Sequence, residues 1–142
     1  VNVAAASAPT FTVSTVDGSA FSPADQRGRP VVVYFYASWC GTCVGGATAL
    51  ARLHAAHPEV SALALDVDPS DTPAMVAQFR RLVPDAIYTF ALDPGGRVAQ
   101  SYGVKALEES VVIGPTGALA FHNTASPTLR LLEEQIQQVA RG

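Results

Sequence analysis

The sequence predicts a single α/β domain built around a mixed β-sheet. An apolar run of β-branched and aromatic residues, Val31–Ala37, has the composition of a strand buried on both faces. It leads into Val44–His57, which lacks proline and is rich in Ala and Leu, as expected for a helix. Strand-like and helix-like segments then alternate up to a hairpin signal at 114–117, which predicts parallel strands followed by an antiparallel edge.

The expected elements follow one another without a linker or an internal repeat. In order they are a strand at 10–16, a helical turn at 21–25, a strand at 31–37, a helix at about 42–57, a strand at 60–67, a helix from 72 to about 82, a strand at 87–92, a short helix at 97–102, strands at 110–113 and 118–122, and a final helix from 126.

Turn formers and caps set the boundaries in the first half of the chain. Asp17-Gly18 is a turn signal that closes the first strand. Ser22 can cap the brief helical turn, with Pro23 at its first position. Gly28-Arg29-Pro30 breaks the chain before the buried strand, and Pro58 ends the helix that follows that strand.

The second half is bounded in the same way. Thr72-Pro73 starts a helix whose apolar face consists of Met75, Val76, Phe79 and Leu82. Gly103 ends the short helix, and Gly114–Gly117 joins the last two strands. Ser126-Pro127 starts the final helix, whose inward-facing residues are Leu129, Leu132, Ile136 and Val139.

Two cysteines, Cys40 and Cys43, lie at the junction between the buried strand and its helix. The unpaired N–H groups of a helix start favour a thiolate, so we expect the pKa of Cys40 to lie below the free value of about 8.5. Cys43 falls on the same side of the first turn, more buried and close enough to form a disulfide. This arrangement suits exchange in which Cys40 attacks and Cys43 resolves. Thr42 can steady the Cys40 thiolate, and Gly41 lets a substrate chain approach closely.

The composition excludes several other classes of function. The chain has 142 residues, nearly half of them hydrophobic, and a net charge of −3 without a basic block, so we expect no nucleic-acid partner. No apolar run approaches the length of about 20 residues that a membrane span needs. A metal site needs more ligands than two thiols, and His54 and His57 fall about four turns along the helix, so we assign no metal ligands.

The first eight residues differ in composition from the rest of the chain. Residues 1–8 are small and Ala-rich, and we expect a flexible remnant left after a signal or anchor segment was removed, with a single domain at 9–142. An ordinary frayed terminus is the alternative.

Trp39-Cys40-Gly41-Thr42-Cys43 after a buried strand resembles the active site of the thioredoxin fold. The flanking pieces resemble the extracytoplasmic ResA, TlpA and DsbE-type thiol–disulfide oxidoreductases; they include Pro9-Thr10-Phe11, Arg27-Gly28-Arg29-Pro30, Leu92-Asp93 with Gly96, and Tyr102-Gly103-Val104. The resemblance spans about residues 9–141. It implies a thioredoxin fold, with helices on both faces of a central mixed sheet and an N-terminal β extension. It also implies a periplasmic or secreted location, with a membrane tether possible in the precursor. In this family Cys40 would be the nucleophile, Cys43 the resolving cysteine and Trp39 a wall of the substrate groove.

One departure from the family lies in the loop after Val104. The family usually has a cis-proline there that faces the disulfide and aligns the substrate, and that position is Glu108, after Leu107. We expect a trans loop or a strained one. Glu108 could place a carboxylate near the sulfurs, raising the pKa of Cys40 and supplying an internal acid or base. The alternative is that Glu108 and Glu109 both point into solvent.

A second departure lies beneath the cysteines. Tyr34 stands where thioredoxins keep a buried carboxylate, and Gly46 stands where the ResA type has a glutamate. Tyr34 can be a hydrogen-bond donor near Cys43 or simply a core aromatic. Without either base, the proton of Cys43 must go to water, to Glu108 or to loop carboxylates such as Asp66.

These observations predict a protein thiol–disulfide oxidoreductase that needs no cofactor beyond the Cys40–Cys43 disulfide. A neutral Gly-Thr between the cysteines, without histidine, favours an intermediate to reducing couple. Its partners would be protein cysteines and a thiol donor or acceptor, and we expect a monomer. The family makes heme-attachment cysteines of apocytochrome c plausible substrates. The alternatives are a metal-binding or non-catalytic module of the same fold and, with less support, a peroxidase-like protein.

Overall fold

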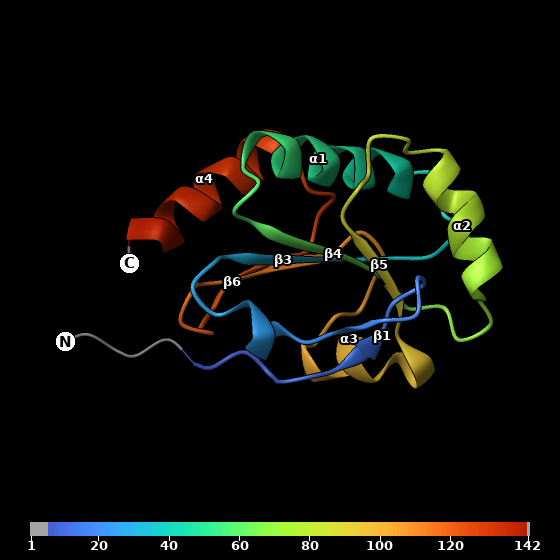
Figure 1. The fold of residues 1–142 in the computed structure, drawn as a ribbon, viewed down its shortest axis with the longest axis horizontal. Coiled ribbons are helices and arrows are strands. Elements are labelled where there is room, and N and C mark those ends of the chain that lie inside the picture. Colours follow the sequence, from blue (N-terminus) through green and yellow to red (C-terminus); the bar gives the residue numbers. More distant parts are fainter. Residues whose placement is uncertain (1–5, 142) are drawn as a thin grey trace.

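A computed structural model describes residues 6–141 and contains a five-stranded sheet between two layers (Figure 1). The strands and helices, with two short 3-10 segments, are β1 (Val13–Ser14), β2 (Ala20–Phe21), η1 (Pro23–Gln26), β3 (Val31–Tyr36), α1 (Cys43–Ala56), β4 (Ser61–Asp66), α2 (Pro73–Arg81), β5 (Thr89–Leu92), η2 (Pro94–Gly96), α3 (Arg97–Ser101), β6 (Ser110–Ile113), β7 (Leu119–Asn123) and α4 (Leu129–Arg141).

The sheet has the order β5-β4-β3-β6-β7, with β3 at its centre. β3 is parallel to β4 and β4 is parallel to β5, whereas β6 and β7 are antiparallel to their neighbours. All six residues of β3 are buried, as expected for a strand covered on both faces. The predicted mixed sheet with an antiparallel edge is therefore confirmed.

Alternate side chains of β3 divide the core into two clusters. Val32, Tyr34 and Tyr36 face the side covered by α1, α2 and α4, and both cysteines belong to this cluster. Val31, Val33 and Phe35 face α3 and the N-terminal segment. Figure 1 shows α1 and α4 on one side of the sheet and α3 with β1 on the other, so the predicted helices on both faces are confirmed.

The N-terminal extension packs along the sheet rather than joining it as a full strand. The strand expected at 10–16 is short, because only Val13–Ser14 pairs with β2, and Thr15 makes one bridge to Ala91 of β5. Residues 6–8, expected within the flexible remnant, are bound to the hairpin before β7: the Ala8 N–H donates to Gly117, and Ser7 bridges Ala118. The rest of that expected remnant, residues 1–5, lies outside the described residues.

Two further boundaries differ from expectation. β5 begins at Thr89 rather than at residue 87, and Ile87 is 77% exposed. α4 begins at Leu129 rather than at residue 126, because the Thr128 hydroxyl accepts the N–H of Leu131 and so caps the helix.

The expected apolar face of α2 is only half buried. Val76 and Phe79 enter the core, whereas Met75 is 42% exposed and Leu82 is 61% exposed. Leu82 lies one residue beyond the helix, which ends at Arg81. Within residues 6–141, none of the helices has the length and apolar character to cross a bilayer.

Candidate active site

Cys40 and Cys43 occupy the turn between the central strand and the first helix. β3 ends at Tyr36 and α1 begins at Cys43 itself, one residue later than expected. The Cys40 N–H donates to the Ala37 carbonyl over 3.1 Å, and the Cys43 N–H donates to the Cys40 carbonyl over 3.1 Å. These bonds hold the two cysteines in one turn, where they form a disulfide with a Cα–Cα distance of 5.3 Å.

The two sulfurs differ in their access to solvent. Cys40 retains 8% of its surface, whereas Cys43 is completely buried. Gly41 between them is exposed, with open space where a side chain would stand. An incoming thiol or disulfide therefore meets Cys40 first.

A short hydrogen-bonded chain runs from Cys40 to Glu108. The Thr42 hydroxyl lies 3.4 Å from Cys40 Sγ and donates to Glu108 Oε2 over 3.1 Å. Glu108 has a left-handed backbone with φ 72°, which costs a non-glycine residue roughly 1–2 kcal/mol. Its N–H donates to the Phe35 carbonyl of β3 over 2.9 Å, which fixes this conformation.

The loop at the expected proline position is therefore trans and strained. The backbone contains no cis peptide bond within residues 6–141. Leu107, partly buried, packs against the apolar cluster that contains both cysteines. The carboxylate of Glu108 thus lies one hydroxyl group away from the reactive sulfur, as one of the two sequence-based alternatives proposed.

Glu109 has the opposite environment, so the alternative that both glutamates point into solvent is wrong for this residue. Its buried carboxylate accepts from His122 Nε2 at 2.6 Å and from the backbone N–H groups of Lys105 and Ala106. Burial alone would raise the pKa of Glu109, but these hydrogen bonds outweigh it and lower that pKa. The pair of Glu109 and His122 anchors the loop that carries Glu108.

Tyr34 and Gly46 form one packing unit below Cys43. The Tyr34 hydroxyl donates to the Cys43 carbonyl over 3.0 Å, so Tyr34 is both a core aromatic and a donor beside Cys43. A Cβ at Gly46 would lie 2.5 Å from that hydroxyl oxygen, so the phenol fills the space that a side chain at this position would need. Burial raises the pKa of Tyr34, and the charge of Glu108 raises it further, so Tyr34 keeps its proton and is no base for Cys43.

Asp66 is completely buried at the end of β4, beside Tyr36 of β3. Its Oδ1 accepts the Asp68 N–H over 2.9 Å, but among residues 6–141 neither its Oδ2 nor the Tyr36 hydroxyl has a hydrogen-bond partner. Burial first, and then the neighbouring Asp71, raise the pKa of Asp66 to about 8. The hydrogen bond of Asp66 goes to the following loop rather than to a cysteine.

The loop after β4 also fixes the residues in front of Cys40. Trp39 is 67% exposed, and its indole N–H donates to the carboxylate of Asp68. The Ser38 N–H donates to Asp71 Oδ2 over 2.9 Å. Hydrogen bonds from Ser70, and then from Trp39, hold the pKa of Asp68 below its usual range. Sequence reasoning missed Asp71; its signal was the position of its loop, at the carboxyl end of a strand next to β3.

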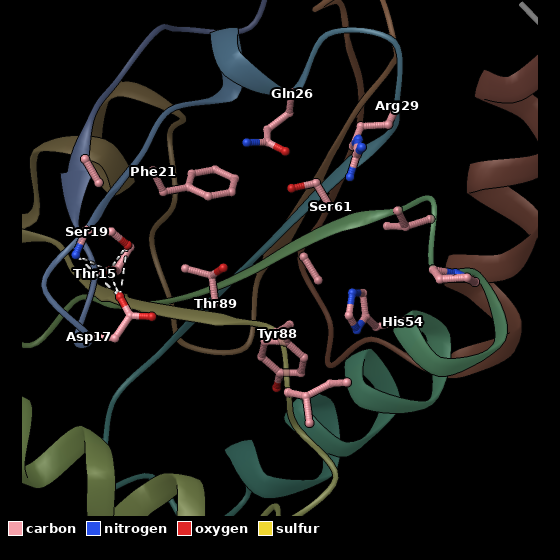
Figure 2. Close-up of a pocket in the computed structure, with 15 residues that line it drawn as sticks. Thr15, Asp17, Ser19, Phe21, Gln26, Arg29, His54, Ser61, Tyr88 and Thr89 are labelled. Atoms are coloured by element: carbon pink, nitrogen blue, oxygen red, sulfur yellow. Dashed lines mark hydrogen bonds between the residues drawn. The ribbon is translucent and has the colours of Figure 1, made fainter.

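A separate pocket of about 340 Å³ lies away from the cysteines (Figure 2). Residues of the N-terminal extension, of β4 and β5 and of the end of α1 line it, and Figure 2 shows Thr15, Asp17 and Ser19 hydrogen-bonded to one another on its wall. Neither cysteine contributes to it, so it is not part of the thiol site.

A Cys-x-x-Cys disulfide between a central parallel strand and the following helix, in a mixed sheet with helices on both faces, defines a thioredoxin-like thiol–disulfide oxidoreductase. The chain belongs to the AhpC/TSA family, which matches residues 4–122.

Two curated relatives illustrate this membership. The chain is 29% identical over 125 residues to "Mercury resistance operon ORF3" of Streptomyces lividans, covering 84% of this chain and 65% of that protein. It is 28% identical over 136 residues to the thiol-disulfide oxidoreductase ResA of Bacillus thuringiensis, covering 93% of this chain and 76% of that protein. The chain thus spans about two thirds to three quarters of the length of these relatives.

Solved structures of thiol–disulfide oxidoreductases have the same fold as this chain. A structure described as a "putative Thiol:disulfide interchange protein DsbE" from Chlorobium tepidum superposes with a TM-score of 0.84 at 27% identity, over 95% of this chain and 96% of the other. A secreted Mycobacterium tuberculosis disulfide oxidoreductase, homologous to DsbE of E. coli, gives a TM-score of 0.77 at 25% identity, over 90% of this chain and 95% of the other. The expected resemblance to the ResA and DsbE type is confirmed.

Proposed function

We propose that this chain reduces disulfide bonds in other proteins through Cys40. The Cys40 thiolate attacks one sulfur of the substrate disulfide, forming a mixed disulfide and releasing one substrate thiol. Cys43 then gives up its proton and attacks Cys40, which releases the second substrate thiol and closes the Cys40–Cys43 disulfide. Two electrons pass to the substrate, and a thiol donor restores the reduced pair. The greater access of Cys40 supports this order of events.

The observation that carries the reducing direction is the hydrogen bond from Thr42 to Glu108. A hydroxyl has one hydrogen to donate, and a carboxylate is a strong acceptor for it. While that hydrogen points to Glu108, the Thr42 hydroxyl does not donate to Cys40 Sγ, which lies 3.4 Å away, and the Thr42 backbone N–H is left to steady the thiolate. The negative charge of Glu108 disfavours the thiolate further. A couple whose thiolate is poorly stabilised has a less stable reduced form and reduces its partners.

The setting of this reaction is also a proposal. We place the protein outside the cytoplasm, where one of its structural neighbours is described as secreted. A membrane tether in a precursor, a monomeric state, a cofactor-free site and a role on the heme-attachment cysteines of apocytochrome c rest on the family resemblance. No group of three histidine, cysteine or acidic side chains suited to a metal occurs in residues 6–141, so nothing besides the thiols favours the metal-binding alternative.

The deciding experiment is the reduction potential of the pair, from equilibration in graded thiol/disulfide buffers with thiol trapping. A two-electron transition on the reducing side supports the proposal, and a transition on the oxidising side identifies a disulfide donor instead. The C43S variant should accumulate a mixed disulfide with a disulfide-bonded substrate protein, whereas C40S should not. Tight metal binding by the reduced protein, or the lack of any reversible transition, would sink the proposal.

A further inference from the structure

Exposed apolar side chains gather beside the reactive cysteine. Four large hydrophobic residues are exposed in the described part of the chain: Trp39, Met75, Leu82 and Ile87. The first three line a single groove of about 610 Å³, and buried Phe79 also lines it. Their clustering at one place distinguishes this groove from scattered exposed apolar residues, which are common on protein surfaces.

The groove adjoins the reaction centre and has a fixed wall. Its residues Ser38 and Trp39 directly precede Cys40. The Ser38 backbone is held by Asp71, and the Trp39 indole is held by Asp68, so the wall is formed before a substrate arrives. When a substrate protein is bound to Cys40 in a mixed disulfide, the residues next to its own cysteine must therefore lie near this groove.

The opposite wall comes from α2 and the residue that follows it. Met75 and Leu82 are seven residues apart, which corresponds to about 10 Å along a helix and to roughly three residues of extended chain. Both side chains belong to the apolar face that the sequence predicts, but the core covers only the part of this face formed by Val76 and Phe79. Polar side chains of Ser70, Asp71 and Gln78 also line the groove and can bind a peptide backbone.

We propose that this groove binds an extended apolar segment of about three residues next to the cysteine of the substrate polypeptide. The inference rests on the proposed exchange at Cys40 and adds a preference among substrates. A small disulfide such as oxidised glutathione has no apolar side chains to place there, whereas an unfolded chain exposes them. Burying such side chains in the groove removes apolar surface from water, which favours binding of the unfolded chain.

The test compares two peptides, each disulfide-linked to glutathione through one cysteine. One carries Leu-Phe-Val beside this cysteine and the other carries Ser-Gly-Ser, and oxidised glutathione serves as the small substrate. We expect kcat/KM to be about tenfold higher for the apolar peptide than for the polar one. The double variant M75Q/L82Q should reduce this ratio to about two, while I87Q, which removes the exposed apolar residue outside the groove, should leave the ratio unchanged.

Equal kcat/KM for the two peptides, or a preference that survives in M75Q/L82Q, would overturn the groove assignment. Thermal unfolding of both variants checks that the glutamines leave the fold intact. Failure of the proposed function looks different, because the wild-type protein would then reduce neither peptide nor oxidised glutathione.

Discussion

The two sides of the Cys40–Cys43 pair are built on different principles. On the Cys43 side lie buried Tyr34 and Gly46, with buried Tyr36 and Asp66 at the ends of β3 and β4; these four residues form the floor. Around Cys40, the side chains of Trp39, Thr42 and Glu108 form a rim that is in contact with solvent. Each is held by a single hydrogen bond: Trp39 donates to Asp68, and Thr42 donates to Glu108. In the floor, a change of one atom alters packing or leaves a buried polar group unpaired. At the rim, a change alters charge beside the reactive sulfur.

This difference separates effects on stability from effects on reactivity. Substitutions in the floor should change the free energy of unfolding, because buried groups cannot exchange a lost partner for water. Substitutions at the rim should change the rate at Cys40 and leave unfolding nearly unchanged, because exposed side chains contribute little to stability. The following predictions test that separation, from the largest expected change in stability to the smallest.

The pH dependence set by Asp66 should be the largest effect. Its pKa rises from 3.8 to about 8 on folding, so the folded state binds the extra proton between these values. The free energy of unfolding of the oxidised protein should therefore fall by a few kcal/mol as the pH rises from about 4 to about 8. D66N should remove most of this slope in chemical denaturation. An equal slope in D66N would show that Asp66 is not the responsible group.

Two adjacent glycines provide the next comparison. Gly46→Ala would push a methyl group against the ring and hydroxyl of Tyr34, and we expect it to cost about 1–3 kcal/mol of stability. Gly45→Ala meets open space on the exposed side of the same helix, and should stabilise the protein by about 0.5–1 kcal/mol. Urea denaturation of both oxidised variants measures the difference. Similar values for the two would mean that Tyr34 can move aside.

Two buried tyrosines give a smaller and more specific effect. Tyr34 donates to the Cys43 carbonyl and Tyr88 donates to the Ala47 carbonyl, both in α1. Y34F and Y88F should each lose about 0.5–1.5 kcal/mol of stability. Only Y34F should also change the rate at which Cys43 resolves a mixed disulfide, measured by quenched-flow thiol trapping. A matching change in Y88F would assign the effect to the helix as a whole.

The rim should show the smallest change in stability and a clear change in reactivity. In E108Q the negative charge beside Thr42 is lost and the neutral amide oxygen is a weaker acceptor, so the hydroxyl donates more readily to the Cys40 thiolate. We expect iodoacetamide to react with reduced E108Q at pH 7 several-fold faster than with the wild type. The stability of E108Q should stay within about 0.5 kcal/mol of the wild type. T42V provides the control, since it lacks the hydroxyl and keeps the charge of Glu108, and it should not show this gain. A slower reaction in E108Q would reverse the role given to this carboxylate.

The sequence was sufficient for the parts that local pattern determines. The apolar run Val31–Tyr36, the position of Cys40 and Cys43 and the closing hairpin all follow from periodicity and turn residues. The extent of burial on α2 did not follow, because its apolar stripe is continuous from Met75 to Leu82 while the core is narrower. A helical pattern shows which residues share a face but not how much of this face another element covers.

The environment of the thiols was harder to predict for a different reason. Glu108 and Glu109 are identical neighbours in sequence, yet one faces Thr42 and the other is buried against His122. The positive φ of Glu108 rotates its side chain away from the regular strand direction. A glutamate rarely has a positive φ, so the residue type does not predict this conformation. The complementarity of Tyr34 and Gly46 likewise depends on a contact between two elements, which a reading of each position separately does not show.

The binding of residues 6–8 to the hairpin before β7 has a practical consequence for handling this protein. Leu119 donates to Ala6, and Leu119 lies opposite Ile113, which pairs with the first residue of β3; the thiols follow the last residue of that strand. α4 ends on the same side in Figure 1. Residue 6 and the end of α4 therefore lie at the end of the domain opposite the disulfide, and a tag or bead joined to the chain beyond them starts from that end. Immobilised protein should present Cys40 outward, which suits capture of mixed-disulfide partners on a solid support.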